Sequence, residues 1–220
     1  MASRDGKTHS IFLTHSEEVN LTALLKLALA YDWLAAQAGK LAAWAVLFAA
    51  LISSGNAFVR YGFDISSNGW LEIQWYLFAA MVMLGAPLVL KLNEHVRVDI
   101  IYGKLKGNGA VYVDIFGLIF FLLPVMALLA YLSWPLFVSM YKSGEMSPNA
   151  GGLIRWPAYL LVPVGFALLM MQGVSELIKR IAFLRGLIED PIGGEAAKSD
   201  DQKQMEALEK VAAARLVGEK

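Results

Sequence analysis

The sequence predicts an all-α integral membrane protein with four transmembrane helices, an amphipathic interfacial helix before them and a cytoplasmic tail after them. Hydrophobic residues make up 57% of the 220-residue chain and charged residues only 17%. Soluble domains carry about 25% charged residues, so this chain is short of polar surface. The apolar residues gather in four segments: Gly39–Val59, Trp70–Leu92, Val111–Tyr141 and Leu153–Leu184.

Each of these segments is long enough to cross a bilayer, which takes about 20 residues in a helix. The run "FGLIFFLLPVMALLAYL" in the third segment has no polar face, which a helix of a soluble bundle would need. The third and fourth segments exceed the minimum, so we expect them to tilt or to extend beyond the hydrocarbon. Together the four segments define a transmembrane domain over residues 39–184.

Residues 1–38 comprise a polar N-terminus and a predicted amphipathic helix. The polar start has no apolar core followed by a small-residue cleavage site, so a cleaved signal peptide is not expected. Read as a helix, this segment has one apolar face and one polar face, and the polar face carries Thr22, Lys26 and Gln37. Asp32 is a charged residue on the apolar face. The apolar face comprises Leu21, Leu24, Leu25, Ala28, Tyr31 and Ala35. We expect this helix to lie in the membrane interface; the alternative is a cytoplasmic extension of the first span.

Residues 185–220 form a predicted polar tail with a turn-rich linker and a short helix. The helix has acidic residues at its start and a narrow apolar stripe of Met205, Leu208 and Ala212. A solvated tail is expected, and a docking helix is the alternative.

Basic residues near the ends of the spans predict the orientation, because cytoplasmic loops are enriched in lysine and arginine. One side carries nine of them and the other side three, which places both termini in the cytoplasm. The nine are Lys26, Lys40, Lys91, Arg97, Lys104, Lys106, Lys179, Arg180 and Arg185, and the three are Arg60, Lys142 and Arg155.

Several functional classes are excluded by composition. The chain has no cysteine, so it has no disulfides, thiolate metal sites or cysteine nucleophiles. Its formal net charge is zero, which gives no indication of nucleic-acid binding. No histidine lies within a span, which excludes haem held between two intramembrane histidines. With no phosphate loop, HExxH or nucleophile elbow, we expect no enzyme activity, catalytic residue, cofactor or metal.

The stretch "LKLNEHVRVDI" holds the strongest candidates for chemistry, namely Glu94, His95 and Asp99. On a helix His95 and Asp99 would share a face, but two ligands are too few for a metal site. The alternation of Val96, Val98 and Ile100 with charged residues also fits a strand or a half-buried interfacial turn. A structural role at the cytoplasmic rim is therefore the expected one.

Three carboxylates lie inside the spans, where a charge is costly and is a functional candidate by default. Glu72, Asp114 and Glu176 all lie near a span end, from which they are expected to reach water or headgroups. The apolar residues around Glu72 predict a partner such as Arg60 or another subunit, with an exposed interfacial carboxylate as the alternative. No charge lies at mid-membrane, where a coupling-ion site would need one.

The segment Arg60–Ile101 resembles the small membrane subunit, of the DctQ type, of tripartite ATP-independent periplasmic (TRAP) transporters. An Arg-Tyr pair ends the first span, a Trp and a Glu open the second, aromatic-Leu-Phe and Gly-Ala lie within it, and His-Val-Arg-Val-Asp follows. These positions are Arg60 and Tyr61; Trp70 and Glu72; Tyr76, Leu77 and Phe78; Gly85 and Ala86; and His95, Val96, Arg97, Val98 and Asp99. One departure is Ile73, where many members carry a second acid.

The resemblance implies a three-part importer of the bacterial inner membrane. A periplasmic substrate-binding protein captures a carboxylated solute, and a large multi-span membrane subunit carries it inward, driven by a sodium gradient. The small subunit forms a heterodimer with the large one and braces it as a scaffold among the membrane lipids. The matching residues would then be structural or partner-contact positions: Arg60, Trp70, Glu72, Gly85, His95, Arg97 and Asp99.

Two other functions stay open at this point. An independent small homo-oligomeric channel or sensor is favoured by Gly85, Ala86 and Gly165, which permit close helix contacts, but no span has a polar stripe to line a pore. A membrane-embedded enzyme would have to use Glu94, His95 and Asp99 at the cytoplasmic interface.

Overall fold

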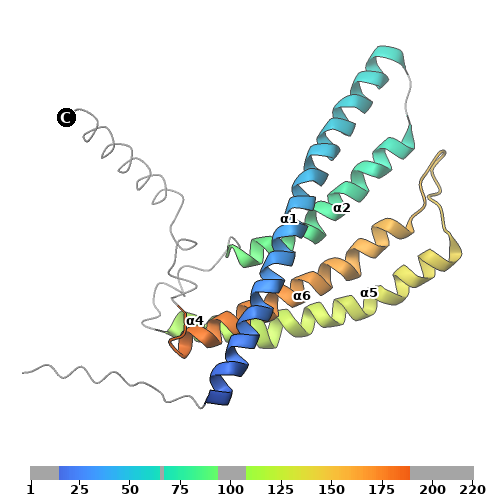
Figure 1. The fold of residues 1–220 in the computed structure, drawn as a ribbon. Coiled ribbons are helices and arrows are strands. Elements are labelled where there is room, and N and C mark those ends of the chain that lie inside the picture. The colour runs from blue at the N-terminus through green and yellow to red at the C-terminus, as the bar shows by residue number, and fades with distance from the viewer. Residues whose placement is uncertain (1–14, 65–66, 94–107, 189–220) are drawn as a thin grey trace, which may run out of the picture.

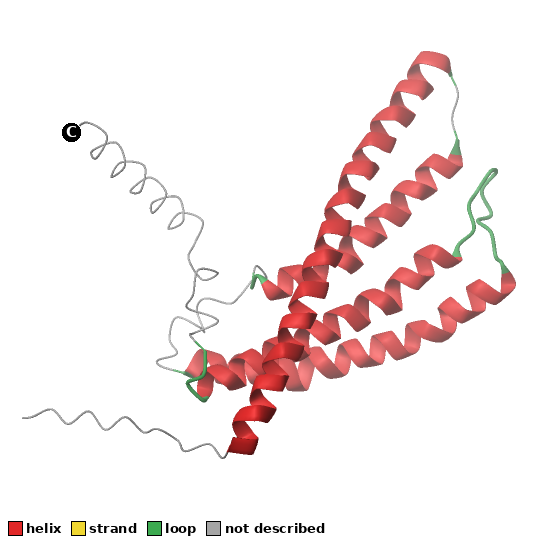
Figure 2. Ribbon diagram, viewed as in Figure 1, coloured by secondary structure: helices red, strands yellow, loops and turns green. Residues whose placement is uncertain are grey.

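A computed structural model describes residues 15–64, 67–93 and 108–188, and these residues are helical apart from their connecting loops (Figures 1 and 2). The described part contains no strand, only an isolated bridge between Met146 and Ile154, so the predicted all-α class is confirmed. The elements are α1 (His15–Phe63), α2 (Asn68–Lys91), α4 (Gly109–Gly117), the π-helix η1 (Leu118–Leu122), α5 (Leu123–Ser143) and α6 (Trp156–Leu184).

Four helical stretches are long and apolar enough to cross a membrane, as predicted: Ala23–Phe63, Asn68–Lys91, Gly109–Ser143 and Trp156–Leu184. The predicted division at Gly39 between an interfacial helix and the first span is not a break in the structure, because α1 is one continuous helix of 49 residues. At about 1.5 Å per residue α1 is far longer than the bilayer hydrocarbon of about 30 Å. That its first part lies in the interface stays a prediction.

A stripe of alanines lets α1 pack against α2 and α6. Its members are spaced alternately by three and four residues, apart from one seven-residue step, which keeps them on one side of the helix. Each is at most 6% exposed, and small side chains of this kind allow helix backbones to approach closely. The stripe consists of Ala28, Ala35, Ala38, Ala42, Ala45 and Ala49.

The contact between α2 and α6 depends on Gly165. A Cβ atom on Gly165 would lie 2.6 Å from the Met83 Cβ and 2.9 Å from the Met83 carbonyl oxygen. Pro87, one turn after Met83, has no N–H to donate to that carbonyl. Glycine at position 165 therefore leaves room for the Met83 carbonyl oxygen, to which Pro87 cannot donate a hydrogen bond.

The third span is α4, η1 and α5 in series. Val111, Asp114 and Leu118 are buried before or at the start of η1, whereas α5 has no buried residue. The wider π turn directly precedes Pro124, whose ring would clash with the carbonyl four residues earlier in a regular helix.

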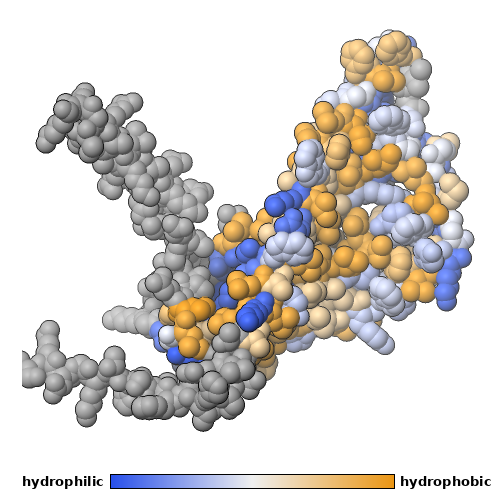
Figure 3. All heavy atoms as spheres, in the orientation of Figure 1, coloured by the Kyte–Doolittle hydropathy of each residue, from blue (hydrophilic) through white to orange (hydrophobic). Residues whose placement is uncertain are grey.

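The outer surface of the helices is largely apolar (Figure 3). On α1 alone Leu41, Trp44, Phe48 and Leu51 are each about half exposed. Apolar surface on this scale has to be covered by lipid or by another membrane protein.

Candidate functional site

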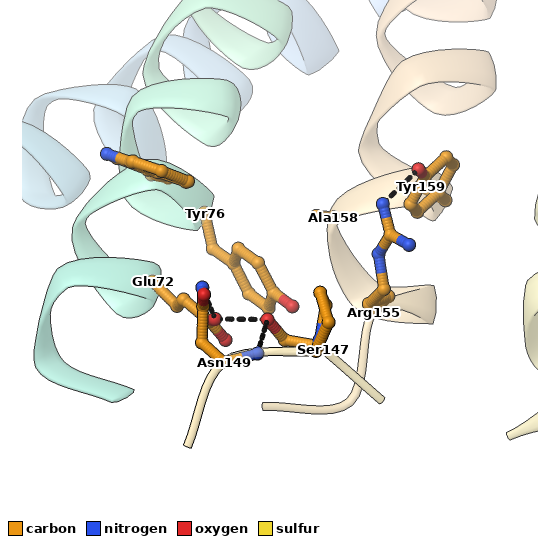
Figure 4. Close-up of a pocket in the computed structure, with 9 residues that line it drawn as sticks. Glu72, Tyr76, Ser147, Asn149, Arg155, Ala158 and Tyr159 are labelled. Atoms are coloured by element: carbon orange, nitrogen blue, oxygen red, sulfur yellow. Dashed lines mark hydrogen bonds between the residues drawn. The ribbon is translucent and has the colours of Figure 1, made fainter. Parts of the chain in front are cut away.

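Two clusters of polar side chains connect different parts of the chain, and the first surrounds Glu72 near the start of α2. One Glu72 carboxylate oxygen accepts hydrogen bonds from the Ser147 hydroxyl and, at 2.8 Å, from the Asn149 amide (Figure 4). The other oxygen accepts the backbone N–H of Leu153 at 2.7 Å. These four residues are called the loop cluster below. They fasten the α5–α6 loop to α2 and leave Glu72 only 4% exposed.

The loop is shaped to meet Glu72. The Ser147 N–H donates to the Leu153 carbonyl at 2.9 Å, which folds the segment back on itself next to the Met146–Ile154 bridge. A Cβ on Gly69 would lie 3.1 Å from the carbonyl oxygen of Gly151, so glycine at 69 lets the loop approach the first turn of α2.

Arg155 borders the same region, where a cavity of about 370 Å³ lies between α2 and α6. Its guanidinium donates to the Glu145 carboxylate at 2.5 Å and to the Tyr159 hydroxyl at 2.9 Å. The hydrogen bond to Glu145 raises the pKa of Arg155 above its usual value. Across the cavity the Tyr76 hydroxyl donates to the Ile154 carbonyl at 2.9 Å. The α5–α6 loop is therefore hydrogen-bonded by Tyr76 on one side of the cavity and by Arg155 on the other.

The second cluster joins α1 to α6 through Asp32. The Asp32 carboxylate accepts hydrogen bonds from Ser175 at 2.7 Å and Gln172 at 2.9 Å, and forms an ion pair with Lys179 at 3.2 Å. Lys179 also pairs with Glu176. Lys91, at the end of α2, donates to the Asp32 backbone carbonyl at 3.1 Å, which ties a third helix to this point.

Arg180 continues this cluster toward the third span. Its guanidinium pairs with Glu176 at 2.5 Å and with Asp114 of α4 at 2.9 Å, and it donates to the Asn93 side chain at 3.2 Å. Arg180, Glu176 and Asp114 are all less than 9% exposed. The helix cluster, as it is called below, consists of Asp32, Lys91, Asn93, Asp114, Gln172, Ser175, Glu176, Lys179 and Arg180.

The structure corrects two predictions about the carboxylates in the spans. The partners of Glu72 come from the α5–α6 loop, whereas Arg60 lies exposed in the last turn of α1. Asp114 and Glu176 do not reach water or headgroups, because Arg180 pairs with both of them inside the bundle.

The other predicted site residues are not brought together. Trp70 is 49% exposed at the start of α2, and Gly85 faces α1, where its Cβ position lies 3.6 Å from that of Ala42. Glu94, His95, Arg97 and Asp99 lie outside the described residues.

Most members of the helix cluster were missed by sequence reasoning, although two signals pointed to them. Asp32 interrupts the apolar face of its helix, which is what a carboxylate facing another helix would do. Polar residues on α6 recur at spacings of three and four, which places them on one face. They are Gln172, Ser175, Glu176, Lys179 and Arg180. For Ser147 and Asn149 of the loop cluster no signal existed.

Chemically, the helix cluster joins helices to one another, and the loop cluster joins the α5–α6 loop to α2. Each carboxylate faces cations or hydrogen-bond donors of the same chain, and such charge-assisted bonds hold their partners firmly. Among the described residues no group of three or more His, Asp or Glu side chains could hold a metal ion.

These features define a polytopic membrane protein whose intramembrane charges connect its own helices. Residues 49–183, more than half of the chain, match the family of tripartite ATP-independent periplasmic transporters, DctQ component, and the chain belongs to that family. It is thus a small-subunit component of a transporter that also has a larger membrane subunit and a substrate-binding protein. Comparison with curated proteins and with solved structures finds no match.

Proposed function

We propose that this chain is the non-catalytic scaffold that braces the large membrane subunit of a sodium-driven importer of carboxylated solutes. In this proposal it lies in the bacterial inner membrane with both termini in the cytoplasm. The large subunit carries the solute and the sodium ions, and a periplasmic binding protein delivers the solute.

The observation that carries the proposal is the internal use of the charged groups. Glu72, Asp114 and Glu176 are each bonded within the chain, and so is Asp32. A coupling-ion or solute site needs polar groups that are available to the cargo, whereas these groups hold helices and a loop in place. Tied helices with an apolar exterior suit a rigid support for a neighbouring protein.

Reconstitution tests this function. Proteoliposomes are prepared with this chain alone, with the co-expressed large subunit, and with both plus the binding protein, and uptake is measured with and without an inward sodium gradient. We expect sodium-dependent uptake of a carboxylated solute only from the complete system, and a stable heterodimer on co-purification. Uptake or ion conductance from this chain alone would contradict the scaffold and favour an independent channel.

A further inference from the structure

The cavity between α2 and α6 carries opposite charges on its two sides (Figure 4). Glu72 of α2 and Arg155 at the start of α6 both line it. In the part of the chain that the structure describes, no hydrogen bond or ion pair joins these two side chains. Aromatic side chains complete the walls, namely Trp75 and Tyr76 on α2 and Tyr159 on α6.

Glu72 has no cation in contact, unlike the carboxylates of the helix cluster, which each pair with a lysine or arginine. Its three donors are neutral groups of Ser147, Asn149 and Leu153, and among the described residues no ion pair reaches it. A carboxylate offers about four acceptor positions, so one of them stays open at the cavity. A positively charged donor would use that position and balance the charge.

Arg155 also has unused capacity. Its guanidinium donates one N–H to Glu145 and one to the Tyr159 hydroxyl, which accounts for two of the five N–H donors of an arginine. The guanidinium carbon lies 5.4 Å from the centre of the Tyr159 ring, which helps to hold the group in place. The other N–H groups have no acceptor within the described segments, and the planar guanidinium suits a carboxylate or a phosphate.

We propose that this cavity binds a small zwitterion, with its ammonium group on Glu72 and its carboxylate or phosphate group on Arg155. Such a ligand uses the open positions on both sides, and the aromatic walls favour the ammonium group. A simple cation would be repelled by Arg155, and a simple anion by Glu72. The volume of about 370 Å³ lies at the lower end of the range of ligand pockets, about 300–1,000 Å³. The ligand adds to the loop bonds of Glu72, and the site does not depend on the proposed scaffold function.

Three small probes test the chemistry of the ligand on the full chain purified in a maltoside detergent. Glycerophosphoethanolamine carries both charges, ethanolamine only the ammonium group, and glycerol phosphate only the phosphate. Calorimetric titration should show glycerophosphoethanolamine binding about tenfold or more tightly than either of the others, because each of those lacks one charge-assisted contact. Equal affinities of the three probes, or no binding of glycerophosphoethanolamine, would overturn the inference.

Substitutions on the two sides separate a binding role from a structural one. Arg155→Gln should remove the preference for glycerophosphoethanolamine over ethanolamine, and Glu72→Gln should remove the preference over glycerol phosphate. Each preference is a ratio measured within one variant, so general loosening of the loop does not produce it. Lys142→Gln is the charge control, because Lys142 lies in the last turn of α5 and does not line the cavity. Preferences that persist in both cavity variants would contradict the assigned contacts.

Glu145→Gln makes a prediction of opposite sign. It removes the carboxylate that competes with the ligand for Arg155, so glycerophosphoethanolamine should bind about threefold more tightly. A purely structural Arg155 would give unchanged or weaker binding, and that result would count against the site. The unfolding temperature of each variant without ligand shows whether it is folded.

Two sources supply this chemistry, a free solute and the headgroup of phosphatidylethanolamine. Nanodiscs of phosphatidylglycerol, with and without phosphatidylethanolamine, distinguish them. If the headgroup occupies the cavity, phosphatidylethanolamine should block the binding of glycerophosphoethanolamine. If a free solute occupies it, glycerophosphoethanolamine should bind equally in both nanodiscs. Absence of binding in either nanodisc would remove the site and leave the scaffold function untouched.

Discussion

Arg180 illustrates how a single residue organises this bundle. Its guanidinium contacts Glu176 on its own helix, Asp114 on α4 and Asn93 after α2. Arginine suits this position because its planar group carries five N–H donors in a fixed arrangement and stays charged when buried. A lysine ammonium has the charge but not the reach to three separate partners.

Replacement of Arg180 by alanine should lower the free energy of unfolding by about 3–5 kcal/mol, because the buried carboxylates of Glu176 and Asp114 would both lose the guanidinium that joins them. Arg180→Lys should be intermediate. Thermal or SDS-induced unfolding of the purified chain in detergent measures both variants. Equal stability of wild type, lysine and alanine variants would show that the ion pairs do not hold the helices.

Glu72 makes a different kind of contact, since it binds a loop and not a helix. Glu72→Gln keeps one side-chain oxygen as an acceptor but replaces the other with an NH2 group, which cannot accept hydrogen bonds from the donors of the loop. We therefore expect faster hydrogen exchange at the Leu153 amide and through the α5–α6 loop. Glu145→Gln is the control, because Glu145 is 42% exposed and such surface ion pairs contribute little. Exchange that is equally slow in both variants would contradict the role assigned to Glu72.

At the scale of helices, the close contact of α2 with α6 depends on the missing side chain of Gly165. Gly165→Ala should destabilise the chain by about 1–3 kcal/mol, because the new methyl group would meet the Met83 backbone. Gly55→Ala is the matched control, since nothing lies within 4 Å of its Cβ position. Unfolding measurements on the two variants should therefore differ, and a similar small effect in both would mean that α2 can move aside freely.

The first part of α1 is predicted to lie against the membrane surface, and its exposed leucine side chains supply apolar area that can be buried there. Leu24 is 44% exposed and Leu25 is half-buried. Leu24→Glu with Leu25→Glu should weaken the seating of the protein in the membrane or its association with the large subunit, because interfacial burial of apolar area is lost. Membrane fractionation and co-purification measure this, and unchanged assembly would count against the interfacial position.

Sequence reasoning was most successful for the helices and least for their connections. Hydropathy located the four spans because lipid requires long apolar helices whatever their partners are. An extension of the first span was the alternative for the segment before Gly39, and α1 is indeed continuous there, with Leu88 of α2 packed against Gly39. The partners of Glu72 were missed, because Ser147 and Asn149 are ordinary loop residues whose role depends on the fold of the loop.

Considered as a whole, the molecule is fastened at both ends. The loop cluster joins the start of α2 to the segment before α6, and the helix cluster joins the ends of α2 and α6 to α1 and α4. Between the clusters the contacts are apolar and close-packed, as at Gly165. Sliding of α2 along α6 would break polar contacts at both ends, which favours a bundle in which these two helices move as one body.

The orientation of this body in the membrane is testable because the chain has no cysteine. Ala150→Cys places a thiol on the exposed α5–α6 loop, and Asn108→Cys places one at the exposed start of α4. The lysine and arginine distribution predicts that an impermeant maleimide labels position 150 in cells with a permeabilised outer membrane. Position 108 should react only after the inner membrane is opened, and the reverse pattern would invert the topology.

The π turn at Leu118–Leu122 has a consequence for the length of the third span. A π turn holds about one residue more than an α turn, and each residue of an α-helix adds about 100° of rotation. The π turn accommodates the extra residue without rotating the helix that follows it. Asp114 before the turn can therefore face Arg180, while α5 after the turn packs along α6. The third span is thus one residue longer than its path through the bundle requires. Deleting one residue there would preserve both alignments but would bring the Pro124 ring against the carbonyl four residues before it, so the extra residue also makes room for the proline.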